Sequence, residues 1–439
     1  MKVLLVIHGY PPRYNAGSEN YTQNLAHGLY EAGIDVAIFT RDVNPFLPEY
    51  HLIREFDTQN PNIPVILINH PRSNIRFRNE HIDLVFREVL EELNPDVVHF
   101  GHLNHLSSGM VKQAQASGAK IVFTIHDYWL ICPRGQFLEW RLTSDDPWSL
   151  CKDQENSKCA EKCFNRYVTG KNPTESQDYW VNWVNERMEE TRKICDIVNL
   201  FIAPSRHLMK RHIEHFGIST EKIVYLDYGF HLERLKHRQR TPEDYFVFGY
   251  IGRHHPSKGL NHLVQAFGKL EGNSKLRIWG KHNGHLTTSL KQVTHGQLSN
   301  GKQIEWFGEY LNQNIIREVF NKCDCIVVPS IWDENSPLVI HEAQQAGVPV
   351  ITSDWGGMGE YVKDEVNGFT FVHRDVADLE IAMKRALDDQ THLKKLGHRG
   401  YLYSDDGSVP SLESHILTIL ELYKELISES LEPERTLCH

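Results

Sequence analysis

Hydrophobic and polar positions along this chain follow two alternating patterns. Short continuous apolar runs recur, and segments with apolar residues every three or four positions lie between them. A continuous apolar run is typical of a strand buried on both faces, and the second spacing is typical of an amphipathic helix. Their alternation predicts an α/β fold with parallel sheets covered by helices on both faces.

The runs fall into two series. In the first, the predicted strands are residues 3–7, 36–40, 65–68, 97–100, 121–125 and 200–203, and the predicted helices are residues 21–31, 82–93, 179–195 and 205–215. In the second, the predicted strands are residues 246–251, 276–279, 304–307, 326–329 and 348–352, and the predicted helices are residues 261–270, 312–321 and 376–387. A polar stretch without a strand, residues 228–244, separates them.

These series predict two Rossmann-like domains, residues 1–235 and 236–405, each large enough for its own core. A last helical pattern over residues 411–428 follows a break at residues 404–410, so residues 406–439 are expected to form a C-terminal helix and tail. The first domain also carries a cysteine-containing insertion, residues 130–170.

Composition narrows the class of protein. The 439 residues are 40% hydrophobic and 24% charged, as in a globular protein. A formal net charge of −10 argues against nucleic acid as a partner. No apolar run approaches the roughly 18 residues of a membrane span. The N-terminal apolar run is interpreted as a first buried strand and not as a signal peptide. The eight cysteines are spread along the chain, which favours a cytoplasmic setting with reduced thiols.

Two glutamates, Glu334 and Glu342, flank the start of a predicted helix. The N–H groups and the positive dipole end at a helix start bind phosphate. Carboxylates accept hydrogen bonds from sugar hydroxyls. The pattern therefore predicts a ligand that is part sugar and part diphosphate, a nucleotide-sugar. The alternative is a solvated helix start with two unrelated acids.

A basic loop follows the first strand of the second series. It contains Gly252, Arg253 and Lys258. Arginine offers a planar fork of donors and lysine a point charge, so together they neutralise a diphosphate and stabilise it as a leaving group. The alternative is a basic surface loop.

The first domain offers two weaker candidates. Gly17 lies in a small-residue loop between a strand and a helix, where backbone N–H groups can approach an anion. His126 follows the fifth strand, and ligands bind at the carboxyl ends of parallel strands. An ordinary turn and a hydrogen-bonded core histidine are the respective alternatives.

Together these motifs resemble glycosyltransferase family 4, whose members are retaining enzymes with the GT-B fold. The resemblance covers about residues 1–400. It implies two Rossmann-like domains facing a central cleft, with a last helix that crosses back onto the first domain. It also implies retaining, metal-independent transfer of a hexose-type sugar from a UDP- or GDP-sugar, in polysaccharide biosynthesis. The acceptor would be a saccharide, a lipid-linked sugar or a small molecule.

The resemblance assigns the transferred sugar to Glu334 and the ribose to Glu342. Pro337 stands where many members have glycine and has no N–H, so the amides of Leu338 and Val339 must contact the phosphate. The catalytic residues implied are Glu334, His126, Arg253 and Lys258. The donor-binding residues implied are Gly17, Gly252, Arg253, Lys258, Gly308, Glu309, Tyr310, Glu334, Ser336, Leu338, Val339 and Glu342.

No catalytic metal or cofactor is expected. The sequence has no Asp-x-Asp motif, and Arg253 and Lys258 would replace a cation electrostatically. Three other functions remain open. A GT-B sugar-nucleotide epimerase would need no acceptor, and a non-catalytic nucleotide-sugar-binding protein would not turn the donor over. A glycosidase would leave the basic pair without a purpose.

Two further features concern the insertion and the acceptor. Cys132, Cys151, Cys159 and Cys163 are spaced unlike common zinc ribbons, so a structural zinc site, disulfides and buried thiols are all open. Arg72, Arg76 and Arg78 alternate with Ile75 and Phe77. This pattern suits an acidic headgroup or a lipid-diphosphate acceptor, with peripheral membrane contact. A solvated loop is the alternative, and the oligomeric state is not indicated.

Overall fold

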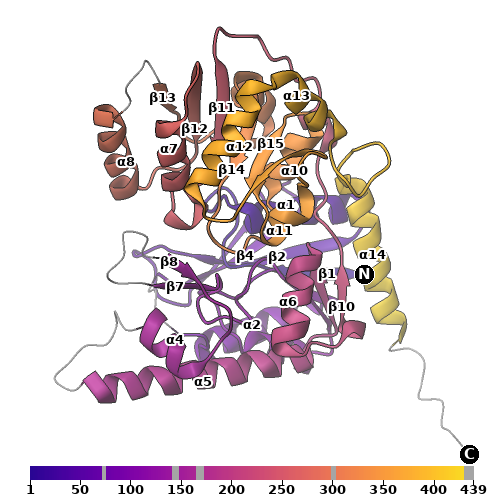
Figure 1. The fold of residues 1–439 in the computed structure, drawn as a ribbon. Helices are drawn as coiled ribbons and strands as arrows, with labels where there is room; N and C mark the ends of the chain where they lie inside the picture. Colours follow the sequence, from indigo (N-terminus) through magenta and orange to yellow (C-terminus); the bar gives the residue numbers. More distant parts are fainter. Residues whose placement is uncertain (72–75, 141–147, 165–172, 298–302, 430–439) are drawn as a thin grey trace, which may run out of the picture. The chain divides into compact units, whose positions relative to one another are not determined.

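The computed structural model of the chain describes residues 1–71, 76–140, 148–164, 173–297 and 303–429. It contains two compact units. The first comprises Met1–Tyr228 and Leu412–His439, and the second comprises Gly229–Ser411. Each unit is built on its own sheet with helices around it (Figure 1).

The sheet of the first unit has eight strands in the order β10-β9-β6-β5-β1-β2-β4-β3. They are β1 (Lys2–Val6), β2 (Asp35–Asp42), β3 (Leu52–Phe56), β4 (Pro64–Asn69), β5 (Val97–Phe100), β6 (Lys120–Thr124), β9 (Leu200–Ala203) and β10 (Ile223–Tyr225). Only β3 is antiparallel to its neighbour, and the sequence did not predict it. Its residues are half-buried or exposed at the sheet edge, so they do not form the continuous apolar run of a central strand.

Helices of the first unit are α1 (Gly17–Glu31), α2 (Glu80–Leu93), α3 (Met110–Ala116), α4 (Asn156–Cys163), α5 (Pro173–Ile197), α6 (Arg206–Phe216) and α14 (Leu412–Glu429). A small hairpin pairs β7 (Leu138–Trp140) with β8 (Trp148–Leu150). The last helix packs on the first, because a Cβ at Gly28 would lie 2.5 Å from the Ile416 side chain. The Tyr21 hydroxyl and His415 Nε2 are also 3.0 Å apart. Helix α14 therefore belongs to the first unit.

The second unit has a six-stranded sheet in the order β13-β12-β11-β14-β15-β16, with all paired neighbours parallel. Its strands are β11 (Phe246–Ile251), β12 (Ser274–Trp279), β13 (Gln303–Trp306), β14 (Cys325–Val328), β15 (Val350–Ser353) and β16 (Gly368–Phe371). Its α-helices are α7 (Leu260–Lys269), α8 (Gly284–Gln297), α9 (Ile315–Glu318), α10 (Leu338–Gln345), α11 (Gly356–Tyr361), α12 (Val376–Asp388) and α13 (Gln390–Arg399). Phe248, Phe267 and Met383 lie in its apolar core, which joins β11, α7 and α12.

The helix predicted over residues 312–321 is interrupted. Only α9 is α-helical, between the 3₁₀ turns η5 (Asn312–Asn314) and η6 (Phe320–Lys322). Asparagine competes with helix formation by hydrogen bonding locally, and the Asn314 side chain donates to Glu318 at 2.8 Å. The prediction of one continuous helix is therefore wrong.

Strand order reverses once in each sheet. In the first unit the reversal lies between β1 and β5, and in the second it lies between β11 and β14. Ligands of open parallel sheets bind outside the carboxyl ends of the strands at such a switch point. In the second unit, a ligand is therefore expected to bind at the loops that follow β11 and β14.

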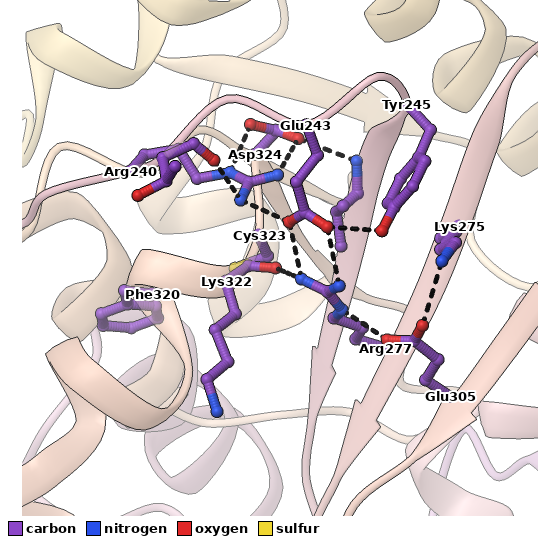
Figure 2. A network of polar contacts seen from close by, with 12 residues as sticks. Arg240, Glu243, Tyr245, Lys275, Arg277, Glu305, Phe320, Lys322, Cys323 and Asp324 are labelled. Atoms are coloured by element: carbon purple, nitrogen blue, oxygen red, sulfur yellow. Dashed lines mark hydrogen bonds and ion pairs between the residues drawn. The ribbon is translucent and has the colours of Figure 1, made fainter.

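A charged network fixes the segment that enters the second unit to its sheet (Figure 2). Glu243 accepts hydrogen bonds from both terminal nitrogens of Arg277 on β12, at 2.9 and 3.0 Å. Arg240 donates to both oxygens of Asp324, at 2.8 and 2.9 Å. It also donates to Glu243 at 2.7 Å. Burial would raise the pKa of Glu243, but the hydrogen bonds from Arg277, Tyr245 and Arg240 lower it to about 2. The carboxylate is thus held in its charged form.

Candidate functional site

Lys258 and Glu334 meet at the switch point of the second unit. Lys258 ends the 3₁₀ turn η4 (Pro256–Lys258) after β11, and Glu334 lies in the loop after β14. Lys258 Nζ is 2.6 Å from Glu334 Oε1, and Ser330 Oγ donates to the same oxygen at 2.6 Å. Glu334 is 5% exposed, so its charge is buried but paired and hydrogen-bonded.

Glycines allow the loops of this site to touch. Gly259 has a φ of +67°, and a Cβ there would lie 1.8 Å from the carbonyl oxygen of Pro329. A Cβ at Gly357 would lie 1.4 Å from the carbonyl oxygen of Asn335. The Gly357 N–H also donates to the Glu334 carbonyl at 2.8 Å. Any side chain at these two positions would push the Lys258 and Glu334 loops apart.

The N-terminus of helix α10 follows the Glu334 loop, and no side chain caps its backbone N–H groups. Pro337 is its N-cap and offers no capping side chain. The N–H groups of Leu338 and Val339 donate to no protein group among the described residues. Ser336 is buried just before them. Two unused N–H groups at the positive end of a helix suit an anion.

Glu342 lies one turn into α10 and is paired with an arginine. Its Oε1 is 2.5 Å from Arg234 Nη2, and Arg234 also donates to the Asn312 carbonyl at 3.1 Å. Burial and then the charge of Glu342 raise the pKa of the Tyr310 hydroxyl. The sequence did not predict Arg234. It lies in a polar segment with three other arginine or lysine residues, and no local signal distinguishes it from them.

The remaining donor candidates of the second unit are more open. Arg253, Gly308 and Glu309 are exposed, and Gly252 is half-buried. Among the described residues, the Arg253 side chain forms no ion pair. The Gly308 carbonyl accepts a hydrogen bond from Gly280 N–H at 3.1 Å, which ties the loops after β12 and β13 together. Arg253 is therefore an exposed cation near the loop of Lys258.

In the first unit, His126 lies just beyond β6. Its Nδ1 is 2.7 Å from the Tyr228 hydroxyl, and burial lowers its pKa to about 3, so the ring is neutral at pH 7. Gly17 begins α1 and is exposed, and Tyr21, one turn later, has its ring 5.1 Å from that of His126. The structure thus brings this helix start and His126 together.

A second histidine of the first unit, His102, has a carboxylate partner. His102 Nε2 lies 3.2 Å from Asp127 Oδ2. The sequence did not predict this pairing. His102 and Asp127 follow different strands, so only the sheet order β6-β5 shows that they meet.

The basic segment is only partly described, because Arg72 and Ile75 lie outside the described residues. Arg76 and Arg78 are exposed, and Arg78 Nε is 3.7 Å from Asp83 Oδ2. The Phe77 ring packs against Trp183, with centroids 5.6 Å apart. Phe77 is half-buried and takes part in packing of the unit.

The four insertion cysteines are free thiols; Cys132, Cys159 and Cys163 are buried and Cys151 is half-buried. Across the described ranges, no group of three or more histidine, cysteine, aspartate or glutamate side chains is arranged to hold a metal ion. None of the helices in these ranges is long and apolar enough to cross a bilayer.

Two family profiles cover nearly the whole chain. One, described as "Glycosyltransferase Family 4", matches residues 15–234. The other, described as "Glycosyl transferases group 1", matches residues 233–403. The first alone covers half of the sequence.

Sequence relatives and solved structures agree with these profiles. An uncharacterized glycosyltransferase of Methanocaldococcus jannaschii is 25% identical over 397 residues, which are 89% of this chain and 90% of the relative. The UDP-Gal:alpha-D-GlcNAc-diphosphoundecaprenol alpha-1,3-galactosyltransferase of Escherichia coli is 30% identical over 207 residues, or 46% of this chain and 50% of that enzyme.

Among solved structures, sucrose-phosphate synthase of Thermosynechococcus elongatus superimposes with a TM-score of 0.68 at 16% identity, over 98% of this chain and 99% of that one. Anabaena HepE, solved with UDP and glucose, gives a TM-score of 0.65 at 17% identity, over 98% and 100%. The fold, the order of the motifs and the profile matches lead to one conclusion: the chain belongs to glycosyltransferase family 4 and has the GT-B fold.

Proposed function

We propose that this glycosyltransferase moves a hexose-type sugar from a nucleotide diphosphate donor to an acceptor with retention of anomeric configuration. The observation that carries the proposal is the group of side chains at the switch point of the second unit. Lys258 is paired with the buried Glu334 at 2.6 Å, beside a helix start whose Leu338 and Val339 N–H groups donate to no group in the described part of the chain. This set matches a ligand with sugar hydroxyls and a diphosphate.

Each part of the donor has a partner in this proposal. Glu334 accepts hydrogen bonds from the transferred sugar, and Glu342 accepts them from the ribose. The diphosphate is bound by Arg253, Lys258 and the first amides of α10. In the free protein Lys258 balances the charge of Glu334. We expect it to turn toward the diphosphate when the donor binds, because that ligand brings a larger negative charge.

The proposed reaction breaks the bond between the anomeric carbon and the diphosphate oxygen. A bond to an acceptor hydroxyl forms on the same face, and the hydroxyl proton goes to the departing phosphate oxygen. No dedicated base is needed, and His126 is proposed as a neutral contact to the sugar because its pKa is about 3. Arg253 and Lys258 stabilise the leaving group, so transfer does not require a metal ion.

Relatives suggest which donor and acceptor to test first. HepE was solved with UDP-glucose, and the E. coli relative is named for a UDP-galactose donor and a diphosphoundecaprenol-linked sugar acceptor. We therefore propose UDP-sugars, ahead of GDP-sugars, as the donors. A lipid-linked acceptor is proposed first, because Arg76 and Arg78 are exposed cations that could meet its diphosphate.

The test is a panel of UDP- and GDP-sugars. A true donor should raise the melting temperature of the protein, because a ligand that binds only the folded state stabilises it. The same donor should then release nucleoside diphosphate only when a lipid-linked or saccharide acceptor is present. A changed sugar without acceptor would indicate an epimerase. Heat protection without turnover on any acceptor would indicate a binding protein.

A further inference from the structure

The second unit holds one tryptophan, Trp355, that the proposed transfer reaction has not used so far. Trp355 lies in the turn between β15 and α11, as the N-cap of that helix, and it is 43% exposed. An exposed apolar residue is not unusual by itself. The role of Trp355 therefore depends on what holds it in place and on which groups lie beside it.

The backbone that carries Trp355 is fixed against the Glu334 loop. The N–H of Gly357 donates to the Glu334 carbonyl at 2.8 Å. Gly356, which directly follows the tryptophan, has a φ of +61°, and a Cβ there would lie 2.6 Å from Asp333 Oδ1. Only glycine combines this backbone conformation with so close an approach. The turn after β15 is therefore pressed onto the loop that presents Glu334.

The Trp355 side chain is held by a histidine. Its ring stacks on that of His373, with centroids 5.7 Å apart and planes 17° from parallel. His373 Nε2 lies 3.1 Å from the Ser330 carbonyl, which can only accept, so Nε2 carries the proton. The His373 backbone N–H donates to Asp354 at 3.1 Å. Burial is the main cause that lowers the pKa of His373 to about 4, so Trp355 rests on a neutral ring at pH 7.

Ser330 links this stack to the candidate donor site. Its carbonyl accepts the hydrogen bond from His373, and its hydroxyl donates to Glu334 Oε1 at 2.6 Å. One serine thus orients the histidine under the tryptophan and also the glutamate proposed to bind the transferred sugar. The Trp355 ring and the Glu334 carboxylate are held by one connected set of contacts within the second unit.

The other face of the Trp355 ring is available to a ligand. In the described part of the chain, His373 is its only aromatic partner, and the indole N–H donates to no protein group. The C–H groups on one face of a pyranose ring form a flat apolar surface that packs on an indole, and an indole N–H can donate to a hydroxyl. A carboxylate for the hydroxyls and an indole for the ring face therefore match a sugar.

We propose that Trp355 stacks on the transferred sugar of the donor, so that the site prefers a sugar nucleotide to the bare nucleoside diphosphate. This inference rests on the proposed function, in which Glu334 binds the same sugar. Glu334 accepts hydrogen bonds at the edge of the sugar ring, and Trp355 covers one of its faces. His373 is a positioning residue that acts through Trp355.

The test is calorimetric titration of the full chain with UDP and GDP, and with UDP-glucose, UDP-galactose and GDP-mannose. Trp355→Ala should lower the affinity for the sugar nucleotide that the wild type binds by about 10-fold, and should leave the affinity for its nucleoside diphosphate unchanged. That unchanged affinity also shows that the second unit of the variant is folded. Trp355→Phe keeps an aromatic face without the N–H and should lose less.

The matched control is Tyr403→Ala. Tyr403 is an aromatic residue of the same unit with a similar exposure of 45%, and its hydroxyl donates to the Glu360 carbonyl near the C-terminal end of α11. Its replacement should change neither affinity. His373→Leu should weaken sugar-nucleotide binding in the wild type but not further in Trp355→Ala, because His373 acts through that ring.

Four results would overturn the proposal. Equal loss of nucleoside diphosphate and sugar-nucleotide affinity in Trp355→Ala would place the ring on the base. Unchanged sugar-nucleotide affinity with a raised KM for the acceptor would place it on the acceptor. No change in either quantity would leave Trp355 without a ligand. A wild-type chain that binds none of the sugar nucleotides would instead contradict the proposed function, and this inference with it.

Discussion

The two glutamates proposed to bind the donor each have a cationic partner in the structure. Glu334 is paired with Lys258 and Glu342 with Arg234, at 2.6 and 2.5 Å. These pairs hold two buried carboxylates in place. We therefore expect replacement of the two glutamates to have different effects on sugar transfer and on nucleotide binding.

Glu334→Ala should abolish transfer while free nucleoside diphosphate still binds, because we propose that this carboxylate contacts only the sugar. Glu342→Ala should weaken nucleotide binding itself by about 1–3 kcal/mol, the value of one charge-assisted hydrogen bond. Calorimetric titration with nucleoside diphosphate and an assay of donor turnover separate the two effects.

Two controls make that comparison decisive. Glu271 is exposed in the same unit, so Glu271→Ala should change neither quantity. Arg234→Met tests whether the loss in Glu342→Ala comes from the carboxylate or from an arginine left unpaired. Equal loss of nucleotide binding in Glu334→Ala and Glu342→Ala would contradict the division of roles.

Individual residues were predictable where the sequence carries a local pattern. Glu334, Glu342 and Lys258 belong to motifs of fixed spacing beside predicted strands and helices. Arg234 does not, because it reaches Glu342 across 108 positions of sequence. The hydrogen bond between His126 and the Tyr228 hydroxyl was not predictable for the same reason, because the two residues are 102 positions apart. Such contacts depend on the order of the strands, which no short window of sequence contains.

At the scale of elements, the continuous apolar strands were predictable because burial on both faces leaves a clear signal. Elements with weaker signals were not. The half-exposed edge strand β3 and the short β16 gave no continuous run, and α9 is shorter than the helix expected there. Helix α10 begins at Leu338, directly after its N-cap Pro337.

The stability of the segment that leads into the sheet of the second unit should depend on Glu243. Glu243→Gln removes the charge that binds Arg277 and Arg240, and should lower the free energy of unfolding by about 1–3 kcal/mol at pH 7. Because folding lowers the pKa of Glu243 from 4.5 to about 2, its contribution is present above pH 4.5 and is lost as pH falls toward 2. The difference between wild type and variant should therefore shrink in acid, as measured by denaturant unfolding at several pH values.

Glu233→Gln is the matched control. Glu233 forms an exposed pair with Lys236, with 82% of its side chain accessible. Exposed pairs contribute little, so this change should be nearly neutral at every pH. If Glu243→Gln and Glu233→Gln have the same free energy of unfolding, the network in Figure 2 does not stabilise the segment that carries Glu243.

At the scale of the whole molecule, the chain carries two open sheets, and each has its own switch point for a ligand. The family and the fold follow from the order of motifs along the sequence. The identities of the donor base, the sugar and the acceptor do not follow from it.

Metal dependence can be tested on the intact enzyme. Transfer should continue in excess EDTA, because we propose that Arg253 and Lys258 supply the positive charge at the diphosphate. A loss of activity that Mg²⁺ or Mn²⁺ restores would contradict this account of the leaving group. Slow loss that only Zn²⁺ restores would instead point to the insertion cysteines.

Retaining transfer from a nucleotide-sugar is the central claim, and proton NMR of the reaction tests it most directly. The donor identified by heat protection is incubated with its acceptor, and the anomeric signal of the first product is followed before equilibration. The account predicts acceptor-dependent release of nucleoside diphosphate and a product with the anomeric configuration of the donor, with no product from Glu334→Ala. A product of opposite configuration, or turnover that survives in Glu334→Ala, would contradict it.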